Sequence, residues 1–123
     1  MKTGHTFGLR DYQRKLMPLT PAVFFILFAL ADGEKHGYAI MQHVRTLSDE
    51  KVRMGPGTLY TTIQRLLDLT LIEETTSGDK SDERRRYYRL TRAGKALLQA
   101  EISRMEAVLK IAQRKKLVAD HAQ

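Results

Sequence analysis

The chain has 123 residues, a hydrophobic fraction of 42% and a formal net charge of +7. This length accommodates one domain with an extension but not two ordinary domains. Because the chain has no cysteine, disulfides, thiolate metal sites and cysteine nucleophiles are excluded, and a reducing compartment such as the cytoplasm is expected. The excess of cations favours a polyanionic partner, either nucleic acid or an anionic membrane surface.

The start of the chain predicts a loose N-terminal arm over residues 1–15. These residues are mainly polar and basic. Leu9, Tyr12 and Leu16 nevertheless have helical spacing, so a short helix in this region stays open.

The longest apolar stretch covers residues 19–31 and predicts the first firm helix. Thr20 followed by Pro21 is a good N-cap and first-turn pair. The stretch is shorter than the about 20 residues that a membrane span needs, and the polar residues before it are not typical of a signal peptide. We therefore expect a buried core helix that ends near Ala31, and no membrane insertion.

Three phenylalanines make this helix apolar on nearly all sides: Phe24, Phe25 and Phe28. A helix of this kind is buried on more than one side, which in so small a chain predicts contact with a partner subunit. Together with Met105, the three rings could also line a cavity between subunits for a small apolar or aromatic effector. Plain core or dimer packing is the commoner use of such residues.

A second helix is expected from about Gly37 to Leu47, after a turn over residues 32–35. His36 is interpreted as a turn residue before the glycine. Tyr38 could hydrogen-bond a phosphate from the start of this helix, although a boundary tyrosine with a packed ring is the commoner arrangement.

The third helix is the most informative segment, and Gly55-Pro56 mark its start because proline suits the first helical position. Its apolar residues recur with helical spacing at Leu59, Ile63, Leu66 and Leu67. The opposite face is uncharged and hydrogen-bonding at first, with a cation further along: it carries Gly57, Thr61, Gln64 and Asp68, flanked by Thr58 and Arg65. Such a face suits a helix whose N-terminal half enters a DNA major groove. An ordinary amphipathic surface helix is the alternative.

The start of the third helix also offers backbone N–H groups at Gly57 and Thr58, where the helix dipole favours an anion. Gly57 has no side chain that would block a close phosphate, although helix initiation alone explains this glycine equally well. We assign Thr61 and Gln64 to base readout, because glutamine can pair with adenine and threonine can contact thymine. Thr58 and Arg65 are assigned to phosphate.

A β-hairpin is expected after the third helix, with strands over Leu71–Thr75 and Arg86–Thr91. Its cations are Lys80, Arg84, Arg85 and Arg86. Arginine forks match phosphate oxygens, so we expect this wing to contact the DNA backbone. A solvated strand is the alternative, with neutralising neighbours at Asp79, Asp82 and Glu83.

The last helix is expected to begin after a cap at Thr91 and to end near Lys116. Its apolar positions repeat about every 3.5 residues, the pattern of a helix that pairs with another helix. They are Leu98, Ile102, Met105, Leu109 and Ala112. A second patch could dock the helix on its own domain: Ala93, Leu97 and Ala100. The repeat predicts a homodimer held by this helix.

The order of these elements predicts a mainly α fold with a small β-hairpin, namely a winged helix-turn-helix plus a long C-terminal dimerisation helix. After the arm, the DNA-binding domain would cover residues 16–91, the dimerisation helix 92–117 and a tail 118–123. Double-stranded DNA is the expected partner. The third helix would read the major groove, and the hairpin would lie along the backbone as a wing.

Four blocks of the sequence follow one another in a family order: LTPAV at 19–23, DGEKHGYAI at 32–40, GPGTLY at 55–60 and RRRYYRLT at 84–91. Together they resemble the PadR family of bacterial transcriptional regulators. The resemblance implies a dimeric winged-helix repressor that dimerises through its C-terminal helix and is often released from DNA by a small molecule. It also implies that Tyr60 contacts the DNA backbone. The single C-terminal helix is similar to the shorter subgroup of the family.

One position departs from the family pattern. The family usually has glycine before the Leu-Ile that opens the first wing strand, where this chain has Thr70. Glycine there would supply a left-handed helix end, and threonine is costly in that conformation. The departure predicts a different exit from the third helix.

The sequence offers little other chemistry. The four histidines do not pair with other ligands at metal-binding spacing, and no nucleophile or acid–base arrangement is present, so no metal, cofactor or enzyme function is expected. Two alternatives to a DNA-binding regulator stay open: a winged-helix module that docks proteins, and a ligand-sensing dimer with weak DNA contacts. A wing with three consecutive arginines favours DNA over protein docking.

Overall fold

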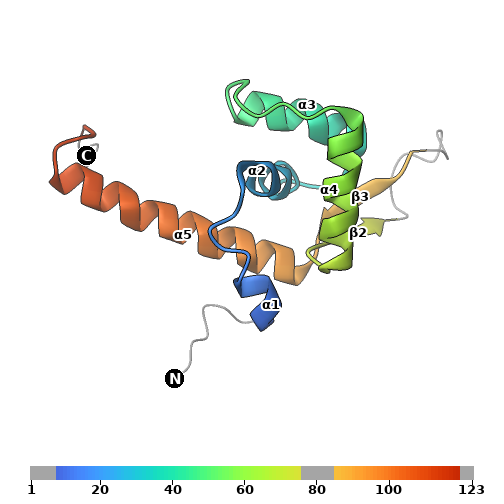
Figure 1. Ribbon diagram of the computed structural model, residues 1–123, viewed down its shortest axis with the longest axis horizontal. Helices are drawn as coiled ribbons and strands as arrows, with labels where there is room; N and C mark the ends of the chain where they lie inside the picture. Colours follow the sequence, from blue (N-terminus) through green and yellow to red (C-terminus); the bar gives the residue numbers. More distant parts are fainter. Residues whose placement is uncertain (1–7, 76–84, 120–123) are drawn as a thin grey trace.

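The computed structural model describes residues 8–75 and 85–119 (Figure 1). Its elements are α1 (Asp11–Arg14), α2 (Pro21–Ala29), β1 (Lys35–His36), α3 (Gly37–Leu47), α4 (Pro56–Asp68), β2 (Ile72–Thr75), β3 (Tyr87–Leu90) and α5 (Arg92–Arg114). The fold is mainly helical with a small antiparallel sheet, which confirms the predicted fold class. Two cations assigned to the wing, Lys80 and Arg84, lie outside the described residues. Within the described ranges, every helix is too short or too polar to cross a bilayer.

The sheet has three strands, whereas the sequence predicted a two-stranded hairpin. The central strand β3 pairs antiparallel with β2, from Ile72 opposite Leu90 to Thr75 opposite Tyr87. On its other side β3 pairs with β1, which consists of Lys35–His36 alone. Two residues are too few to show the alternation that marks a strand. Because α3 follows β1 directly, this pairing fixes the start of α3 beside the wing.

The core lies between the helices and one face of the sheet, and α2 is at its centre. Ile26, Leu27 and Ala29 have no exposed surface. α2 contacts both α3 and α5 of its own chain, which explains a helix that is apolar on nearly all sides without a partner subunit. α3 and α4 bury the residues that their spacing indicated, namely Ile40, Val44, Leu59, Ile63 and Leu66.

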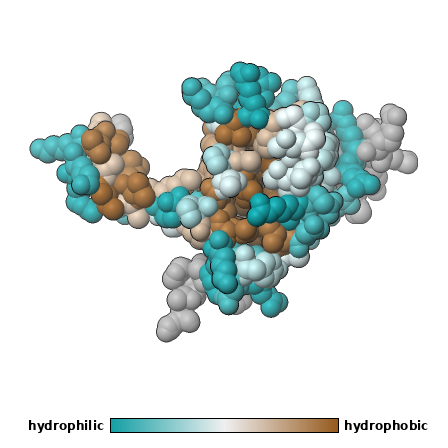
Figure 2. Space-filling view, in the orientation of Figure 1, coloured by the Kyte–Doolittle hydropathy of each residue, from teal (hydrophilic) through white to brown (hydrophobic). Residues whose placement is uncertain are grey.

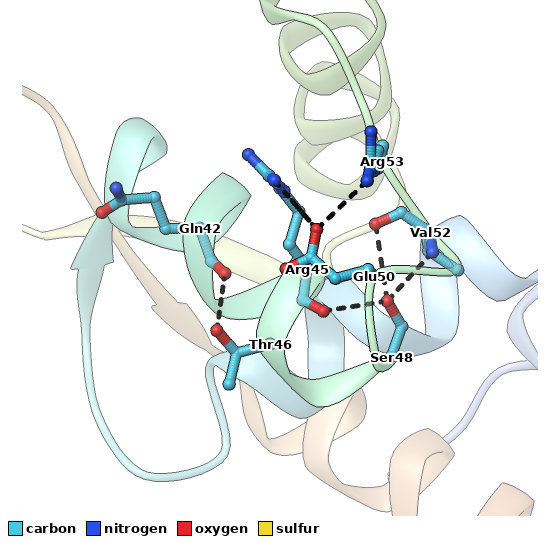
Figure 3. A network of polar contacts seen from close by, with 7 residues as sticks. All are labelled: Gln42, Arg45, Thr46, Ser48, Glu50, Val52 and Arg53. Carbon is cyan, nitrogen blue, oxygen red and sulfur yellow. Dashed lines mark hydrogen bonds and ion pairs between the residues drawn. The ribbon is translucent and has the colours of Figure 1, made fainter.

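The turn between α3 and α4 is held by a polar network (Figure 3). Ser48 is 7% exposed, and its Oγ accepts the N–H of Val52 at 3.0 Å and lies 3.4 Å from the carbonyl oxygen of Arg45. The carboxylate of Glu50 bridges the guanidinium groups of Arg45 and Arg53 at 2.8 and 3.5 Å. Glu50 has a φ of 65°, a conformation that is costly for a residue with a side chain. The network therefore stabilises the turn that sets α4 against α3.

The exit from α4 differs from the expectation based on Thr70. Thr70 takes a φ of 58°, the left-handed conformation that glycine usually supplies. Its N–H donates to the carbonyl oxygen of Leu67 at 3.0 Å, and the N–H of Leu71 donates to that of Leu66, also at 3.0 Å. This pair of hydrogen bonds is a Schellman motif. The expectation of a different exit was therefore wrong, and α4 ends as it would with glycine.

Side chains from two other elements offset the cost of this conformation. Gln13 of α1 is 1% exposed, and its Nε2 donates to Thr70 Oγ1 at 3.0 Å and to the preceding carbonyl oxygen at 2.7 Å. Thr91 Oγ1 donates to the carbonyl oxygen of Thr70 at 2.6 Å. Leu9 is buried as well. The interpretation of a loose arm is therefore wrong for residues 9–14, which pack on the domain.

α5 begins inside the domain and projects beyond the other helices at its far end (Figure 1). Thr91 caps it as expected, because its Oγ1 accepts the N–H of Gly94 at 3.0 Å. Leu97 has no exposed surface and Leu98 is 4% exposed. Leu98 thus belongs to the core of its own chain, which corrects its assignment to the dimer seam.

A buried carboxylate joins α5 to the segment that precedes α2. Glu101 is 1% exposed, and its Oε2 accepts the N–H of Leu19 at 2.8 Å. The guanidinium of Arg104 donates to both carboxylate oxygens at 2.8 and 3.2 Å. These bonds from Arg104 lower the pKa of Glu101 below its ordinary value of 4.5, against the opposing effect of burial, and the N–H of Leu19 lowers it further. Glu101 is therefore charged at neutral pH and holds α5 on the domain.

Candidate nucleic-acid interface

The outward face of α4 carries the side chains that were expected to meet DNA. The exposed residues are Gly57, Thr58, Tyr60, Thr61, Gln64 and Arg65. In Figure 2 the surface over α4 is mainly pale, neither strongly hydrophilic nor hydrophobic. The face thus presents neutral hydrogen-bonding groups over its N-terminal half, as base readout requires.

The far end of this face is less suited to DNA. Gln64 Nε2 donates to Asp68 Oδ1 at 3.0 Å, which leaves the second N–H and the carbonyl oxygen of the amide for a base. The carboxylate of Asp68 repels phosphate. Arg65 lies apart from the other predicted residues, because it lines a depression of about 40 Å³ with residues around the start of α2, among them Leu19 and Thr20. The N-terminal half of α4 is therefore the part of this face that suits DNA best.

A groove of about 390 Å³ lies where the start of α3, α4 and the wing meet. It is lined by His36, Gly37, Tyr38, Tyr60, Arg85, Arg86 and Tyr88. Four of these residues were predicted to bind DNA, and the structure brings them together from three separate elements. They are Tyr38, Tyr60, Arg85 and Arg86. The sequence did not indicate the other three lining residues as part of a site.

Both arginines of the groove have neighbours in the protein. Arg85 Nη1 lies 3.1 Å from His36 Nε2. Arg86 Nη1 lies 3.4 Å from Glu74 Oε2, and the side chain of Arg86 is 76% exposed. An ion pair this exposed contributes little to stability, so the guanidinium of Arg86 can exchange the carboxylate for a phosphate oxygen.

The three tyrosines of the groove differ in their exposure. Tyr38 is 58% exposed and Tyr60 is 50% exposed, so both rings extend toward solvent. The hydroxyl of Tyr38 accepts a hydrogen bond from Gln42 Nε2 at 3.1 Å and keeps its own proton to donate. Tyr88 is 3% exposed, and burial, followed by the charge of Glu74, raises its pKa. Tyr88 is therefore uncharged and forms the floor of the groove.

Two of the unforeseen residues join elements to each other. His36 caps α3, because its Nδ1 accepts the N–H of Ala39 at 3.2 Å. A polar residue before a helix is a sequence signal for such a cap, and the turn interpretation of His36 overlooked it. Gly37 contacts Tyr60, which is distant in the chain, and no local sequence signal indicates such a contact.

A second exposed region covers the far half of α5. Of the expected seam residues there, Met105 is 39% and Leu109 is 44% exposed, while Ile102 packs partly against the core and Ala112 is partly exposed. Two further apolar residues that the seam did not include are exposed, namely Val108 at 55% and Ile111 at 44%. Figure 2 shows hydrophobic surface on the projecting end of the molecule.

The residues suggested for an effector cavity are three phenylalanines of α2 and one methionine of α5. The rings of Phe24, Phe25 and Phe28 pack on one another, with centroid distances of 5.1, 5.4 and 6.5 Å. Phe24 belongs to the core, and the other two are partly buried against it. Met105 is on the exposed half of α5. In the part of the chain that the structure describes, no three acidic or histidine side chains gather as a metal site would require.

Comparison with known proteins gives both a family and relatives. The model of the transcriptional regulator PadR-like family matches residues 26–100. The transcriptional regulator Rv3488 of Mycobacterium tuberculosis is 40% identical over 91 residues, which are 73% of this chain and 76% of that protein. An uncharacterized 37.1 kDa transposon protein of Streptomyces fradiae is 37% identical over 89 residues, 72% of this chain, but the chain spans only 24% of its length.

Solved structures agree with the fold. A transcriptional regulator from Clostridium thermocellum has a TM-score of 0.60 and 27% identity, over 85% of this chain and 97% of that one. Bacillus subtilis PadR in complex with operator DNA has a TM-score of 0.57 and 24% identity, over 65% of this chain and 45% of that one. The matched family consists of transcription regulators and not of enzymes. On the family model and the Mycobacterium tuberculosis relative, this chain belongs to the PadR-like family of transcriptional regulators.

Proposed function

We propose that the chain is a homodimeric transcription regulator that binds double-stranded DNA through α4 and the wing. The observation that carries this proposal is the neutral, hydrogen-bonding N-terminal half of α4 beside a groove that contains Arg85 and Arg86. Neutral groups suit the base edges of a major groove, and arginines suit the phosphates that flank it. The net charge of +7 supports the same partner.

Within this proposal the side chains have two kinds of role. Thr61 and Gln64 contact bases. A larger group contacts the backbone: Tyr38, Gly57, Thr58, Tyr60, Arg85 and Arg86, together with Lys80 and Arg84 of the wing. Arg65 is the weakest member of the phosphate group, because it lies at the last turn of α4 near the start of α2. Bacillus subtilis PadR, a protein of the same fold, is solved in complex with operator DNA, which supports DNA as the partner.

The far half of α5 supports the homodimer. Met105, Val108, Leu109 and Ile111 are all more than a third exposed, and a projecting apolar surface of this kind is typical of a contact between chains. Two winged-helix domains joined in this way would read two half-sites of an operator.

We further propose that the regulator is a repressor and that a small apolar or aromatic molecule releases it from DNA. The partly exposed rings of Phe25 and Phe28 support such a site if the partner's α5 covers them in the dimer. Their packing with Phe24 also fits a purely structural role.

The experiment that tests the recognition helix compares two duplexes. We would measure the affinity of Thr61→Ala and Gln64→Ala for the DNA upstream of the protein's own gene and for a scrambled duplex of equal length. A base contact predicts a loss on the first duplex alone, on the order of 1–3 kcal/mol for each good contact. Gln99→Ala, an exposed glutamine on α5, serves as the control and should bind like the wild type.

Equal losses on both duplexes, with unchanged thermal stability, would assign Thr61 and Gln64 to phosphate and leave specificity to the shape of the DNA. Failure of the wild type to distinguish the two duplexes would count against a sequence-specific regulator.

A further inference from the structure

α4, the wing and α5 meet at one junction, which lies at the end of α4 that is remote from the proposed base contacts. α4 ends at Asp68, beside the start of α5 (Figure 1). Thr91 ties the two helices, because its Oγ1 donates to the carbonyl oxygen of Thr70 and accepts the N–H of Gly94 in the first turn of α5. The N–H of Thr91 also donates to the carbonyl oxygen of Leu71 at 3.1 Å. The exit from α4 is thus bonded directly to the start of α5.

Gln13 of α1 holds the residue that connects α4 to the wing. Gln13 is 1% exposed, and its Nε2 donates both to Thr70 Oγ1 and to the carbonyl oxygen of Leu69. At the other end of the amide, Oε1 accepts the N–H of Arg10 at 2.9 Å, so the side chain is anchored within α1. Thr70 has a φ of 58°, which threonine adopts only at a cost. A buried side chain of α1 therefore fixes the direction in which the chain leaves α4.

The direction of α4 at this junction determines where its DNA-facing start lies. α4 has 13 residues, which span about 20 Å at the helical rise of about 1.5 Å per residue. A rotation of about 10° at the junction would therefore move the start of α4 by about 3 Å, close to the rise of about 3.4 Å for one base pair. In a dimer joined through the far half of α5, such a shift changes the separation of the two recognition helices.

We propose that Gln13 and Thr70 are positioning residues for operator binding, because they set the angle between α4 and α5 and hence the spacing of the half-sites that the dimer accepts. Neither residue touches DNA. Without Gln13, Thr70 relaxes toward the conformations that threonine prefers, and α4 tilts on a core that stays folded. The inference rests on the proposed function, since it requires a dimer that binds two half-sites through α4.

The test compares a full operator with one half-site. The operator duplex is the shortest part of the DNA upstream of the protein's own gene that keeps full affinity, and the half-site duplex is one half of it. We expect Gln13→Ala to lose roughly tenfold in affinity for the operator, where two helices must fit at once, and less than about twofold for the half-site. Thermal melting and analytical ultracentrifugation check that the variant is folded and dimeric. Equal losses on both duplexes, or none on either, would overturn the role of Gln13.

The preferred spacing of the half-sites gives a second readout, which a loss of stability alone would not change. Operators with one base pair added to or removed from the centre are compared with the natural operator. The wild type should prefer the natural spacing, and Gln13→Ala should lose that preference. The control is Tyr12→Ala, which changes a neighbour in α1 that is 48% exposed and should behave like the wild type. A Gln13→Ala variant with the spacing preference of the wild type would contradict a change of angle.

Thr70→Gly tests the link between Gln13 and Thr70. Glycine adopts a positive φ without the cost that threonine has, so Thr70→Gly should keep the angle with or without Gln13. We expect Thr70→Gly to bind the operator like the wild type, and the addition of Gln13→Ala to lower the affinity less than about twofold. A roughly tenfold loss for Gln13→Ala in this background as well would overturn the proposal. This comparison remains available where Gln13→Ala alone does not fold.

Failure of the proposed function would give a different pattern. A wild type that binds no DNA, or that binds the operator as a monomer, would overturn both proposals. A wild type that binds the operator as a dimer, with a Gln13→Ala variant equal to it on every duplex, would overturn the positioning role alone.

Discussion

Both halves of α5 carry apolar side chains, but only the first half buries them within the chain. Leu97 and Leu98 are 0% and 4% exposed, whereas Val108 and Leu109 are 55% and 44% exposed. The first half is part of the core of a winged-helix domain, and the second half projects from it (Figure 1). Helical spacing shows which residues share a face, but it does not show whether that face meets the same chain or another. The first half of α5 thus stabilises the fold of its own domain, and the second half is left for contact with another chain.

The largest effect on folding is expected in the first half, at Gly94. A Cβ atom at this position would lie 1.9 Å from the carbonyl oxygen of Leu71, which is backbone and cannot move aside. Gly94→Ala should lower the free energy of unfolding by about 3 kcal/mol, the upper range for overpacking. Chemical denaturation measures this loss.

The matched control is Gly57→Ala, because this helical glycine has open space around its Cα. Its stability should be unchanged or higher by up to about 1 kcal/mol. Equal stability of the two variants would contradict the close packing of α5 on the wing.

An intermediate effect is expected at Glu101, where the two halves meet. Glu101→Gln keeps an acceptor for the N–H of Leu19 but loses the charged pair with Arg104. We expect a loss of about 1–2 kcal/mol at neutral pH, reduced from the value for a fully buried pair because Arg104 is 43% exposed.

The loss at Glu101 should depend on pH with a definite sign. The folded-state pKa of Glu101 is lowered, so its contribution is present above the ordinary value of 4.5 and disappears as the pH falls through the folded-state pKa. Denaturation of both proteins from pH 8 to pH 3 measures the difference. A gap between wild type and Glu101→Gln that stays constant over this range would contradict the charged pair.

The smallest effect on folding, but the largest on association, is expected in the second half. Met105→Lys combined with Leu109→Lys changes two exposed side chains, so the melting of the domain itself should hardly change. Two charges in an apolar contact should convert the dimer to a monomer and weaken operator binding, since each half-site alone binds poorly. Analytical ultracentrifugation at micromolar concentration measures the change. A wild type that is already a monomer would contradict the proposed dimer.

Much of the fold could be predicted from the sequence because its signals are local. α3 has the expected boundaries, and Thr20, Pro56 and Thr91 mark helix starts where caps and first-turn residues were expected. Features that depend on distant residues could not be predicted. β1 has two residues and exists only because β3 offers a pairing edge. Thr70 holds a left-handed conformation with the help of Gln13, which is 57 positions away in the chain.

The candidate site shows the same division. The face of α4 follows from helical periodicity, so the exposure of Thr58, Thr61 and Gln64 was predictable. The groove combines the start of α3, α4 and the wing. These elements meet through contacts such as that of Gly37 with Tyr60, which leave no periodic signal in the sequence. Leu98 was wrongly assigned to the dimer seam, because an apolar repeat has the same spacing whether it faces the core of its own chain or a partner chain.

The most direct test of DNA regulation is the specificity of the wild-type protein. Its affinity would be measured for the DNA upstream of its own gene and for a scrambled duplex, over a series of salt concentrations. We expect the first duplex to bind at least about a thousandfold more tightly at physiological salt, with both affinities falling as salt rises. Equal affinities for the two duplexes, or binding that does not depend on salt, would contradict the account.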